Sequence, residues 1–317
     1  MPSVGVVLGA GGIVGAAYHA GVLTALAEAG FDARDADLIV GTSAGSAVGA
    51  SLRAGFPPLD LAARNLGAPI SAEAASIVGR TGGPPTLNLR PRPFSRAPFP
   101  SSPKLLVNSA RHPTKVLTGL LPTGTIATDV IGERISLMFG DRTWPEQRLW
   151  ICAVDLEHGD RVVFGRDPPD PAVGVAVQAS SAIPGFFRPV EHEGRRYVDG
   201  GVHSPTNADL LTDERFDVVV IISPMSATRL AHGALLPNVR PMHARRLAKE
   251  VDHIRRSGAR VLTFQPTPDV VSAMGRNSMD PNRRERTTAA ALASARERLA
   301  DPRVAERLEL LRSTSPA

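Results

Sequence analysis

The chain has 317 residues, 43% of them hydrophobic, which is enough to bury a sizeable core. Its net charge of +5 comes mostly from arginine, but aromatic residues make up only 4% and no zinc-finger or RNA-binding signature occurs, so nucleic acid is excluded as an expected partner. Cys152 is the single cysteine, which excludes an internal disulfide and suits a reducing, cytoplasmic compartment.

The first elements in chain order alternate strand and helix. An apolar run predicts a strand over 4–8, and helical spacing follows over 15–29. A second strand over 38–40 and a second helix over 44–54 repeat this order, which favours a largely parallel sheet with helices on its faces. Residues 4–27 are apolar enough to resemble a membrane span, but the glycines of GAGGIVG interrupt them, so any membrane contact would be peripheral.

Residues 67–124 break this rhythm. They include PPTLNLRPRPFSRAPFPSSPK, which is rich in proline and arginine, and then LLVNSARHPTKVLTGLLP with its scattered leucines. A segment of this length inside a compact domain is usually functional or disordered. We interpret it as a surface insertion that is either mobile or a lid over a site.

The second half of the chain predicts further strands and helices. Apolar runs predict strands over 150–156, 161–165, 217–223 and 259–264. Helical spacing predicts helices near 125–139, 170–180, 204–212, 240–257 and 283–312. The turn EHGD joins the first two strands as a hairpin, so we expect a mixed sheet. Residues 1–317 are expected to form one α/β domain, with a C-terminal helical segment over 283–317 packed against it.

The stretch GTSAG, residues 41–45, places Ser43 between two glycines where a strand gives way to a helix. Alone, G-x-S-x-G is a weak signal. In this setting, however, a sharp strand-to-helix turn would expose the Ser43 hydroxyl beside a helix N-terminus, which favours developing negative charge. The flanking glycines permit the tight backbone that such a turn needs. Ser43 is therefore a candidate nucleophile.

The stretch VVLGAGGIVG supplies candidate donors for that negative charge. Gly11 and Gly12 carry no side chain, so their N–H groups can point at an oxyanion. The alternative for this loop is dinucleotide binding through a turn that is similar to G-x-G-x-x-G. A dinucleotide fold needs an acidic residue at the end of the second strand, where this chain has Gly41, Thr42 and Ser43 instead.

A serine nucleophile needs a base, and the residues alone leave two kinds open. One kind is a late histidine, as in α/β-hydrolases, and the candidates are His192, His203, His232, His243 and His253. The other is Asp199, which two glycines follow in RRYVDGGVHSP and which could contact the serine directly. Because D-G is a common hairpin signal, Asp199 could equally sit in an ordinary turn.

Three stretches together resemble the patatin-like phospholipase family. They are GAGGIVGAAYHAGVL (9–23), GTSAGS (41–46) and QASSAIPGFFRPVEHEGRRYVDGGVHSPTNADLL (178–211). The resemblance covers about residues 3–223, whereas 67–124 and everything after about 265 lie outside its specific part. It implies a patatin-like mixed, largely parallel sheet between helices.

The resemblance also implies roles for particular residues. Ser43 would be the nucleophile and Asp199 its base, and the oxyanion hole would be formed by Gly11 and Gly12. Family members hydrolyse lipid acyl esters without a metal, so neither a metal nor another cofactor is expected. This chain departs from the family loop G-G-G-x-R-G at two positions, since Ala10 replaces the first glycine and Val14 the basic residue.

These patterns predict a serine acyl-ester hydrolase that forms an acyl-enzyme. The alternative is a catalytically weak or inactive protein of the same fold that binds lipid or regulates, because the altered loop would no longer support turnover. The substrate would be a phospholipid, a neutral lipid or a soluble ester. The arginine clusters are first of all interpreted as an ordinary solvated face, and the alternative is peripheral contact with an anionic membrane.

Some neighbouring polar residues have simpler interpretations. His19 lies on a predicted helix directly behind the glycine-rich loop and is expected to be a packed or hydrogen-bonded helix residue. Asp155 and His158 fit a polar hairpin tip better than a metal site. Arg188, Arg195 and Arg196 flank the Asp199 turn and are expected to be exposed surface residues, with contact to a phosphate head group as the alternative.

Overall fold

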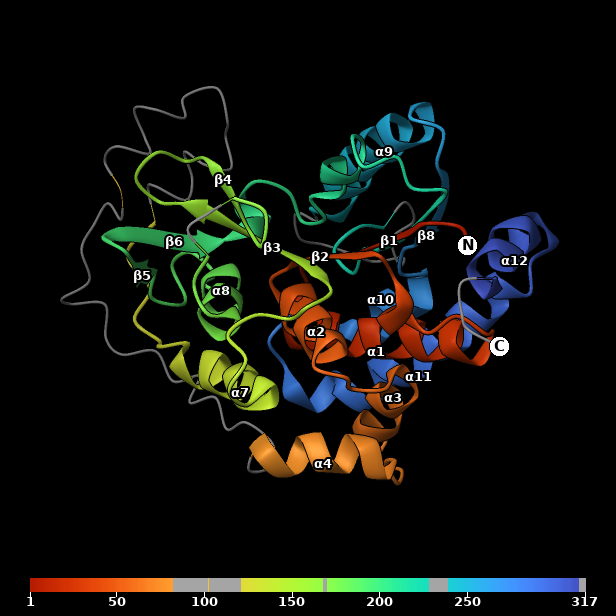
Figure 1. Ribbon diagram of the computed structural model, residues 1–317, viewed down its shortest axis with the longest axis horizontal. Coiled ribbons are helices and arrows are strands. Elements are labelled where there is room, and N and C mark those ends of the chain that lie inside the picture. The colour runs from red at the N-terminus through yellow and green to blue at the C-terminus, as the bar shows by residue number, and fades with distance from the viewer. Residues whose placement is uncertain (82–101, 103–120, 168–169, 228–238, 314–317) are drawn as a thin grey trace.

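Eight strands form one sheet in the order β5-β6-β3-β2-β1-β7-β8, with β4 also paired to β3 (Figure 1). This computed structural model describes residues 1–81, 102, 121–167, 170–227 and 239–313. The strands are β1 (Val4–Leu8), β2 (Leu38–Thr42), β3 (Arg148–Asp155), β4 (Arg161–Phe164), β5 (Val190–His192), β6 (Arg195–Asp199), β7 (Val218–Ile222) and β8 (Arg260–Phe264). The central strands β3, β2, β1, β7 and β8 run parallel, whereas β4, β5 and β6 pair antiparallel.

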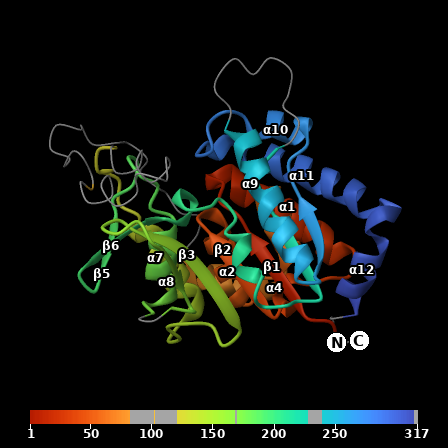
Figure 2. The same cartoon turned by 90° about the horizontal axis from the view of Figure 1, so that it is seen from above.

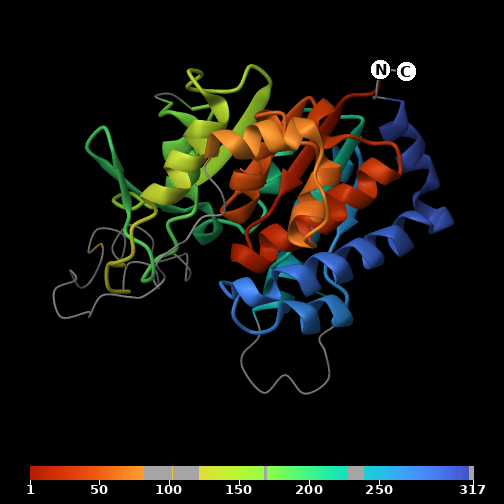
Figure 3. The same ribbon diagram turned by 90° about the horizontal axis from the view of Figure 1, so that it is seen from below.

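Helices cover both faces of this mixed sheet. They are α1 (Gly12–Glu28), α2 (Ala44–Arg53), α3 (Pro58–Asn65), α4 (Ala72–Thr81), α7 (Asp129–Phe139), α8 (Val173–Ser180), α9 (Arg240–Arg256), α10 (Pro268–Met274), α11 (Arg284–Leu299) and α12 (Ala305–Arg312). Seen from above, α9 lies over one face (Figure 2), and from below α1 (red), α4 (orange) and α11 (blue) lie on the other (Figure 3). Of these described helices, none is long and apolar enough to cross a membrane.

The buried strands divide their side chains between two cores. In β1, Val6 and Leu8 belong to the core beneath α1 and α2, whereas Val7 faces the core beneath α9. The same alternation holds in β7, where Val220 and Ile221 point to opposite cores. Successive side chains of a strand point to opposite faces, so a central strand buried on both sides reads as the continuous apolar run seen in the sequence.

The predicted α/β class and the largely parallel, mixed sheet are confirmed. The EHGD turn joins β3 and β4 as an antiparallel hairpin, as expected. The first predicted helix begins earlier than its spacing suggested, at Gly12, so the glycine-rich loop is shorter than expected. The helix predicted over 204–212 is wrong: only Ala208–Leu211 is helical, as a single 3-10 turn, because Asn207 before it adopts a left-handed backbone with φ 52°.

The segment 67–124 contains one element that its composition did not reveal. Helix α4, Ala72–Thr81, lies inside it and buries Ala74 and Ile77 in the main core. Residues 82–101 and 103–120 lie outside the described part of the chain. The interpretation of this segment as a mobile insertion or a lid therefore stays a prediction.

The C-terminal segment packs against the sheet's helices as expected, although as two helices rather than one. The break falls at Asp301 and Pro302, where proline cannot continue the hydrogen-bond ladder. Helix α11 lies so close to α1 that a side chain at Gly21 would come within 2.7 Å of Thr288 and Leu292 backbone atoms. This glycine lets the two helices approach each other directly.

Candidate active site

Ser43 occupies a sharp turn between β2 and α2. Its backbone has φ 54° and ψ −121°, a region that non-glycine residues rarely adopt and that costs about 1–3 kcal/mol. The glycines on either side have no room for a side chain: a Cβ on Gly41 would lie 2.5 Å from Cα of Ser46, and one on Gly45 would lie 1.9 Å from the Leu8 carbonyl oxygen. The GTSAG pattern is therefore required by the backbone geometry of the turn.

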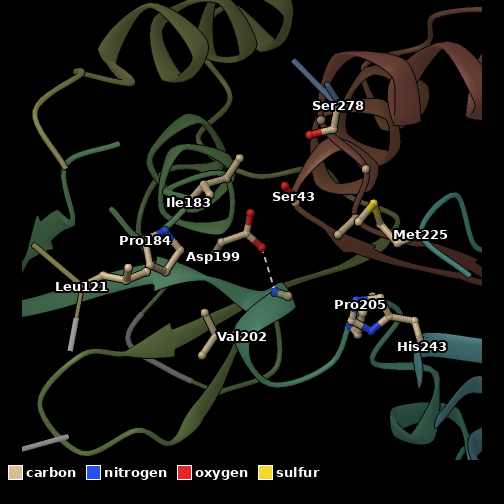
Figure 4. A pocket seen from close by; sticks show the side chains of 14 residues that line it. Ser43, Leu121, Ile183, Pro184, Asp199, Val202, Pro205, Met225, His243 and Ser278 are labelled. Atoms are coloured by element: carbon tan, nitrogen blue, oxygen red, sulfur yellow. Dashed lines mark hydrogen bonds between the residues drawn. The ribbon is translucent and has the colours of Figure 1, made fainter. Parts of the chain in front are cut away.

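The register of the sheet brings Ser43 and Asp199 together. Thr42, just before Ser43, lies opposite Cys152 of β3. On the other side of β3, Asp199 at the end of β6 lies opposite Ala153. The two side chains therefore flank β3 at the same level, and the Asp199 carboxylate faces the Ser43 hydroxyl (Figure 4).

Asp199 is buried, with 6% of its surface exposed, and it ends a strand instead of forming a hairpin tip. Asp199 does begin a turn, since its carboxylate accepts from the Gly201 amide in the 3-10 turn Gly200–Val202, but that turn does not join two paired strands; the hairpin between β5 and β6 is made by Glu193 and Gly194. Burial raises the pKa of Asp199 from 3.8 to about 6, while hydrogen bonds from the Ser43 hydroxyl and the Gly201 amide, the latter at 2.7 Å, pull it down. Such a carboxylate ionises near neutral pH, as a general base requires.

Ser180, at the end of α8, fixes the turn that holds Ser43. Its hydroxyl oxygen accepts a hydrogen bond from the Ser43 amide at 2.9 Å and donates to the Cys152 carbonyl at 2.7 Å. All of these groups are buried. Sequence reasoning missed this role: QASSAIPG entered only as part of a family pattern, and nothing in its spacing separates Ser180 from Ser181.

The glycine-rich loop presents free amides to the same site. Within the described residues, no hydrogen bond uses the amides of Gly11 and Gly12, although those of Gly9, Ala10 and Val14 have backbone acceptors. Gly12 has φ +62°, and a Cβ there would lie 2.7 Å from the Ser278 carbonyl oxygen. The two glycines thus leave their N–H groups open at the N-terminus of α1, where the helix dipole favours an anion.

Four contacts anchor this loop without a basic residue at Val14. The Gly9 amide donates to Ile222 at 2.9 Å, the Ala10 amide to Pro205 at 2.7 Å and the Val14 amide to Ser278 at 3.1 Å. The fourth comes from His19, which is fully buried and whose Nε2 lies 2.7 Å from the Gly9 carbonyl oxygen. Burial lowers the pKa of His19 to about 4, so it is neutral and donates from Nε2, as a hydrogen-bonded helix residue should.

The loop after Asp199 is held by a buried polar network. Asn207 donates from its side chain to the Thr42 hydroxyl at 3.1 Å, which links this loop to the residue before the nucleophile. Glu250 of α9 accepts from the hydroxyls of Ser204 and Thr206 and from the Ala208 amide. Because buried polar groups are costly unless paired, this network fixes the path of the chain behind Asp199.

Two cavities meet at Ser43. One, of about 310 Å³, is lined by Ser43, Asp199, Gly11 and Gly12 together with apolar side chains such as Met225 (Figure 4). The other, of about 460 Å³, runs between α1 and α2. It shares Ser43, Gly12 and Ile183 with the first and is otherwise lined mainly by alanine, isoleucine, phenylalanine and methionine. An ester at Ser43 would therefore have mostly apolar space on either side.

The candidate histidines take different places. His243 of α9 lines the first cavity, and burial followed by the charges of Arg240 and Arg246 lowers its pKa. His192 lies on β5, His203 follows a 3-10 turn and His253 lies on α9, while His232 is outside the described residues. The side chain that faces the Ser43 hydroxyl in Figure 4 is the Asp199 carboxylate.

The other polar residues singled out in the sequence are structural. Asp155 forms a hairpin tip, where its carboxylate accepts from the Glu157 amide at 2.7 Å and the His158 amide at 3.1 Å. Arg196 forms an ion pair with Glu157 and Arg195 lies 3.9 Å from Asp155. Both arginines thus have carboxylate neighbours, which weakens the idea that they receive a phosphate.

Comparisons with known proteins found related sequences and a solved structure with some likeness. Uncharacterized NTE family proteins of Mycobacterium tuberculosis and Mycobacterium bovis are 30% identical over 224 residues, which is 70% of this chain and 49% of theirs, so the chain spans about half the length of these relatives. A solved structure of VipD from Legionella pneumophila matches with a TM-score of 0.40 and 14% identity, covering 99% of this chain and 67% of that one, a likeness too low to support an argument. Residues 6–212 match the model of the patatin-like phospholipases, so this chain belongs to the patatin-like phospholipase family.

Proposed function

We propose that this chain is a serine acyl-ester hydrolase that acts on lipids through a Ser43/Asp199 dyad. The observation that carries the proposal is that the Asp199 carboxylate faces the Ser43 hydroxyl in one cavity (Figure 4), where burial raises the pKa of that carboxylate to about 6. A carboxylate of this kind is ionised at neutral pH and still basic enough to accept a proton in a transition state. Membership of a lipid hydrolase family supports the substrate class.

In the acylation step, Ser43 Oγ attacks the ester carbonyl carbon while Asp199 takes the hydroxyl proton. The carbonyl oxygen becomes an oxyanion, and the open amides of Gly11 and Gly12 are the groups we assign to stabilise it. As the tetrahedral intermediate collapses, the bond to the alcohol breaks and Asp199 returns the proton to that leaving oxygen. The product is an ester between the acyl group and Ser43.

In the deacylation step, Asp199 removes a proton from a water molecule that attacks the acyl carbon. The same amides hold the second oxyanion. When the bond to Ser43 Oγ breaks, Asp199 gives its proton back to that oxygen and the carboxylic acid leaves. Each turnover thus consumes one ester and one water and restores both side chains.

The test is hydrolysis of a p-nitrophenyl ester series of increasing acyl length by the wild type, Ser43→Ala and Asp199→Asn, with folding checked by circular dichroism. We expect activity in the wild type and a loss of at least a thousandfold in both variants. Ser272→Ala is the matched control, because Ser272 is an exposed serine of α10 and lines neither cavity. Full activity of folded Asp199→Asn would refute the dyad and return the role of base to a histidine, with His243 as the first to test.

An organophosphate that labels serine hydrolases gives an independent readout. It should add one group to the wild type, at Ser43, and none to Ser43→Ala. Lipid binding that survives Ser43→Ala, together with a wild type that hydrolyses no ester, would instead support the inactive lipid-binding alternative.

A further inference from the structure

Two consecutive residues, Ser278 and Met279, lie between the two cavities that meet at Ser43. Ser278 lines the first cavity and Met279 lines the second, and Gly12 belongs to both. A Cβ built on Gly12 would lie 2.7 Å from the Ser278 carbonyl oxygen and 2.9 Å from the Met279 sulfur, so both residues pack directly on this glycine. They therefore form part of the wall that separates the cavities.

Backbone contacts fix the segment that carries these two residues. It joins α10 to the 3-10 turn Pro281–Arg283, which leads into α11. The Ser278 carbonyl accepts from the Val14 amide at 3.1 Å, and the Met279 amide donates to the Asn277 side chain at 3.0 Å. The backbone thus sets the position of Met279 beside the glycine-rich loop, and the Met279 side chain is left to shape the second cavity.

The place of Asp199 decides which half of an ester each cavity receives. Asp199 lines the first cavity (Figure 4) and is not among the described residues that line the second. In the proposed reaction this carboxylate returns a proton to the alcohol oxygen, so the alcohol must lie on the side of the first cavity. The acyl chain leaves the carbonyl carbon on the other side and enters the second cavity, whose wall is mainly apolar.

We propose that Met279 determines specificity for the acyl group, because its side chain limits the width of the second cavity beside the ester carbonyl. Met225 has the corresponding place in the first cavity, where the alcohol lies. Met279 lies beyond residue 212, where the family match ends, so a segment outside that match sets which acyl groups are accepted. This inference rests on the proposed function and narrows its substrate to esters whose acyl chain is unbranched next to the carbonyl.

The experiment compares two p-nitrophenyl esters whose acyl groups are isomers, hexanoate and 2-ethylbutanoate, so that only branching beside the carbonyl differs. We expect Met279→Ala to raise the branched-to-linear ratio of kcat/KM by about tenfold, because it removes side-chain atoms from the wall of the acyl cavity. Met279→Val removes less and should raise the ratio by a smaller factor. Met242→Ala is the matched control, because Met242 is an exposed methionine of α9 that lines neither cavity, and it should keep the wild-type ratio.

A second pair of esters varies the alcohol instead of the acyl group. Hexyl hexanoate and 2-ethylbutyl hexanoate share one acyl chain, and their alcohols are isomers. Met279→Ala should leave the kcat/KM ratio of this pair unchanged, whereas Met225→Ala should raise it for the branched alcohol by about tenfold and leave the acyl pair unchanged. A general loosening of the site would move both pairs together, so the split between the pairs separates specificity from a structural effect.

The role of Met279 is refuted if Met279→Ala changes the alcohol pair alone, changes both pairs equally or changes neither. Failure of the proposed function would look different, since the wild type would then hydrolyse none of the four esters. In that case, calorimetric titration of Ser43→Ala with ethyl hexanoate and ethyl 2-ethylbutanoate still tests the cavity wall. A gain of about tenfold in relative affinity for the branched ester in Ser43→Ala/Met279→Ala, but not in Ser43→Ala/Met242→Ala, would support the assignment. An unchanged relative affinity would overturn it.

Discussion

The amide of Ser43 donates to the hydroxyl oxygen of Ser180 at 2.9 Å, so the nucleophile's backbone is held by a side chain from the end of α8. Because Ser180 also donates to the Cys152 carbonyl, one hydroxyl links α8, β3 and the turn after β2. The nucleophile's position thus depends on a residue that is far from it in the sequence.

Removing that hydroxyl should weaken both stability and catalysis. Ser180→Ala leaves the buried Ser43 amide and Cys152 carbonyl without this partner, which costs about 1–3 kcal/mol of unfolding free energy. We expect kcat to fall roughly tenfold, because the strained turn is less firmly positioned. Denaturant unfolding and ester hydrolysis measure the two effects. Ser272→Ala, which removes an exposed hydroxyl from α10, is the control, and wild-type kcat in Ser180→Ala would contradict the positioning role.

Activity should depend on pH through Asp199. The proposed base works as a carboxylate, and its pKa is raised to about 6 by burial. We therefore expect kcat/KM to be constant above about pH 7 and to fall tenfold per pH unit well below 6. A pH profile on a neutral ester tests this. A profile with no inflection between pH 5 and 7, in protein that stays folded over that range, would argue against Asp199 as the base.

The same carboxylate should make the protein less stable at high pH. Since its folded pKa is raised from 3.8 to about 6, the folded state holds the proton more tightly; the stabilisation is full below 3.8 and is lost as the pH rises through 6. Asp199→Asn, which is always neutral, should gain roughly 2 kcal/mol relative to the wild type between pH 4 and 8. Urea unfolding at both values measures this gain. A difference that does not change with pH would contradict the raised pKa.

The backbone strain at Ser43 can be measured with two substitutions. Both Ser43→Gly and Ser43→Ala should abolish hydrolysis, but glycine adopts φ 54° readily and alanine does not. We expect Ser43→Gly to be more stable than Ser43→Ala by about 1 kcal/mol in thermal unfolding. The same pair at Ala47, inside α2, should show the reverse order, because glycine destabilises a helix. Equal stability of the two Ser43 variants would mean that the turn is not strained.

The sequence predicted best what depends on local patterns. Buried strands appear as apolar runs, and Gly41 and Gly45 mark the turn because no side chain fits beside Ser46 or the Leu8 carbonyl. Ser43 could therefore be selected as a nucleophile from its flanking residues. Such features can be recognised from adjacent residues or from a regular spacing of apolar residues.

What the sequence could not provide is pairing between distant residues. Asp199 was chosen over a histidine through the family resemblance alone, because only the register of β2, β3 and β6 brings it to Ser43. Ser180 lies 137 positions from Ser43 in the sequence, and Asn207 lies 165 positions from Thr42. A single polar residue forms no periodic pattern, so these two contacts could not be predicted from the sequence.

The placement of β1 between β2 and β7 has a consequence for synthesis on the ribosome. Strand β1, Val4–Leu8, pairs with β7, Val218–Ile222, and the Gly9 amide donates to the Ile222 carbonyl. Neither this strand pairing nor the anchoring of the glycine-rich loop can therefore be completed until the first 222 residues have left the exit tunnel. Until then the nascent chain carries an unpaired apolar strand edge, which is prone to aggregation. Emerging chains would therefore depend on chaperones, and hydrolytic activity would appear only late in translation.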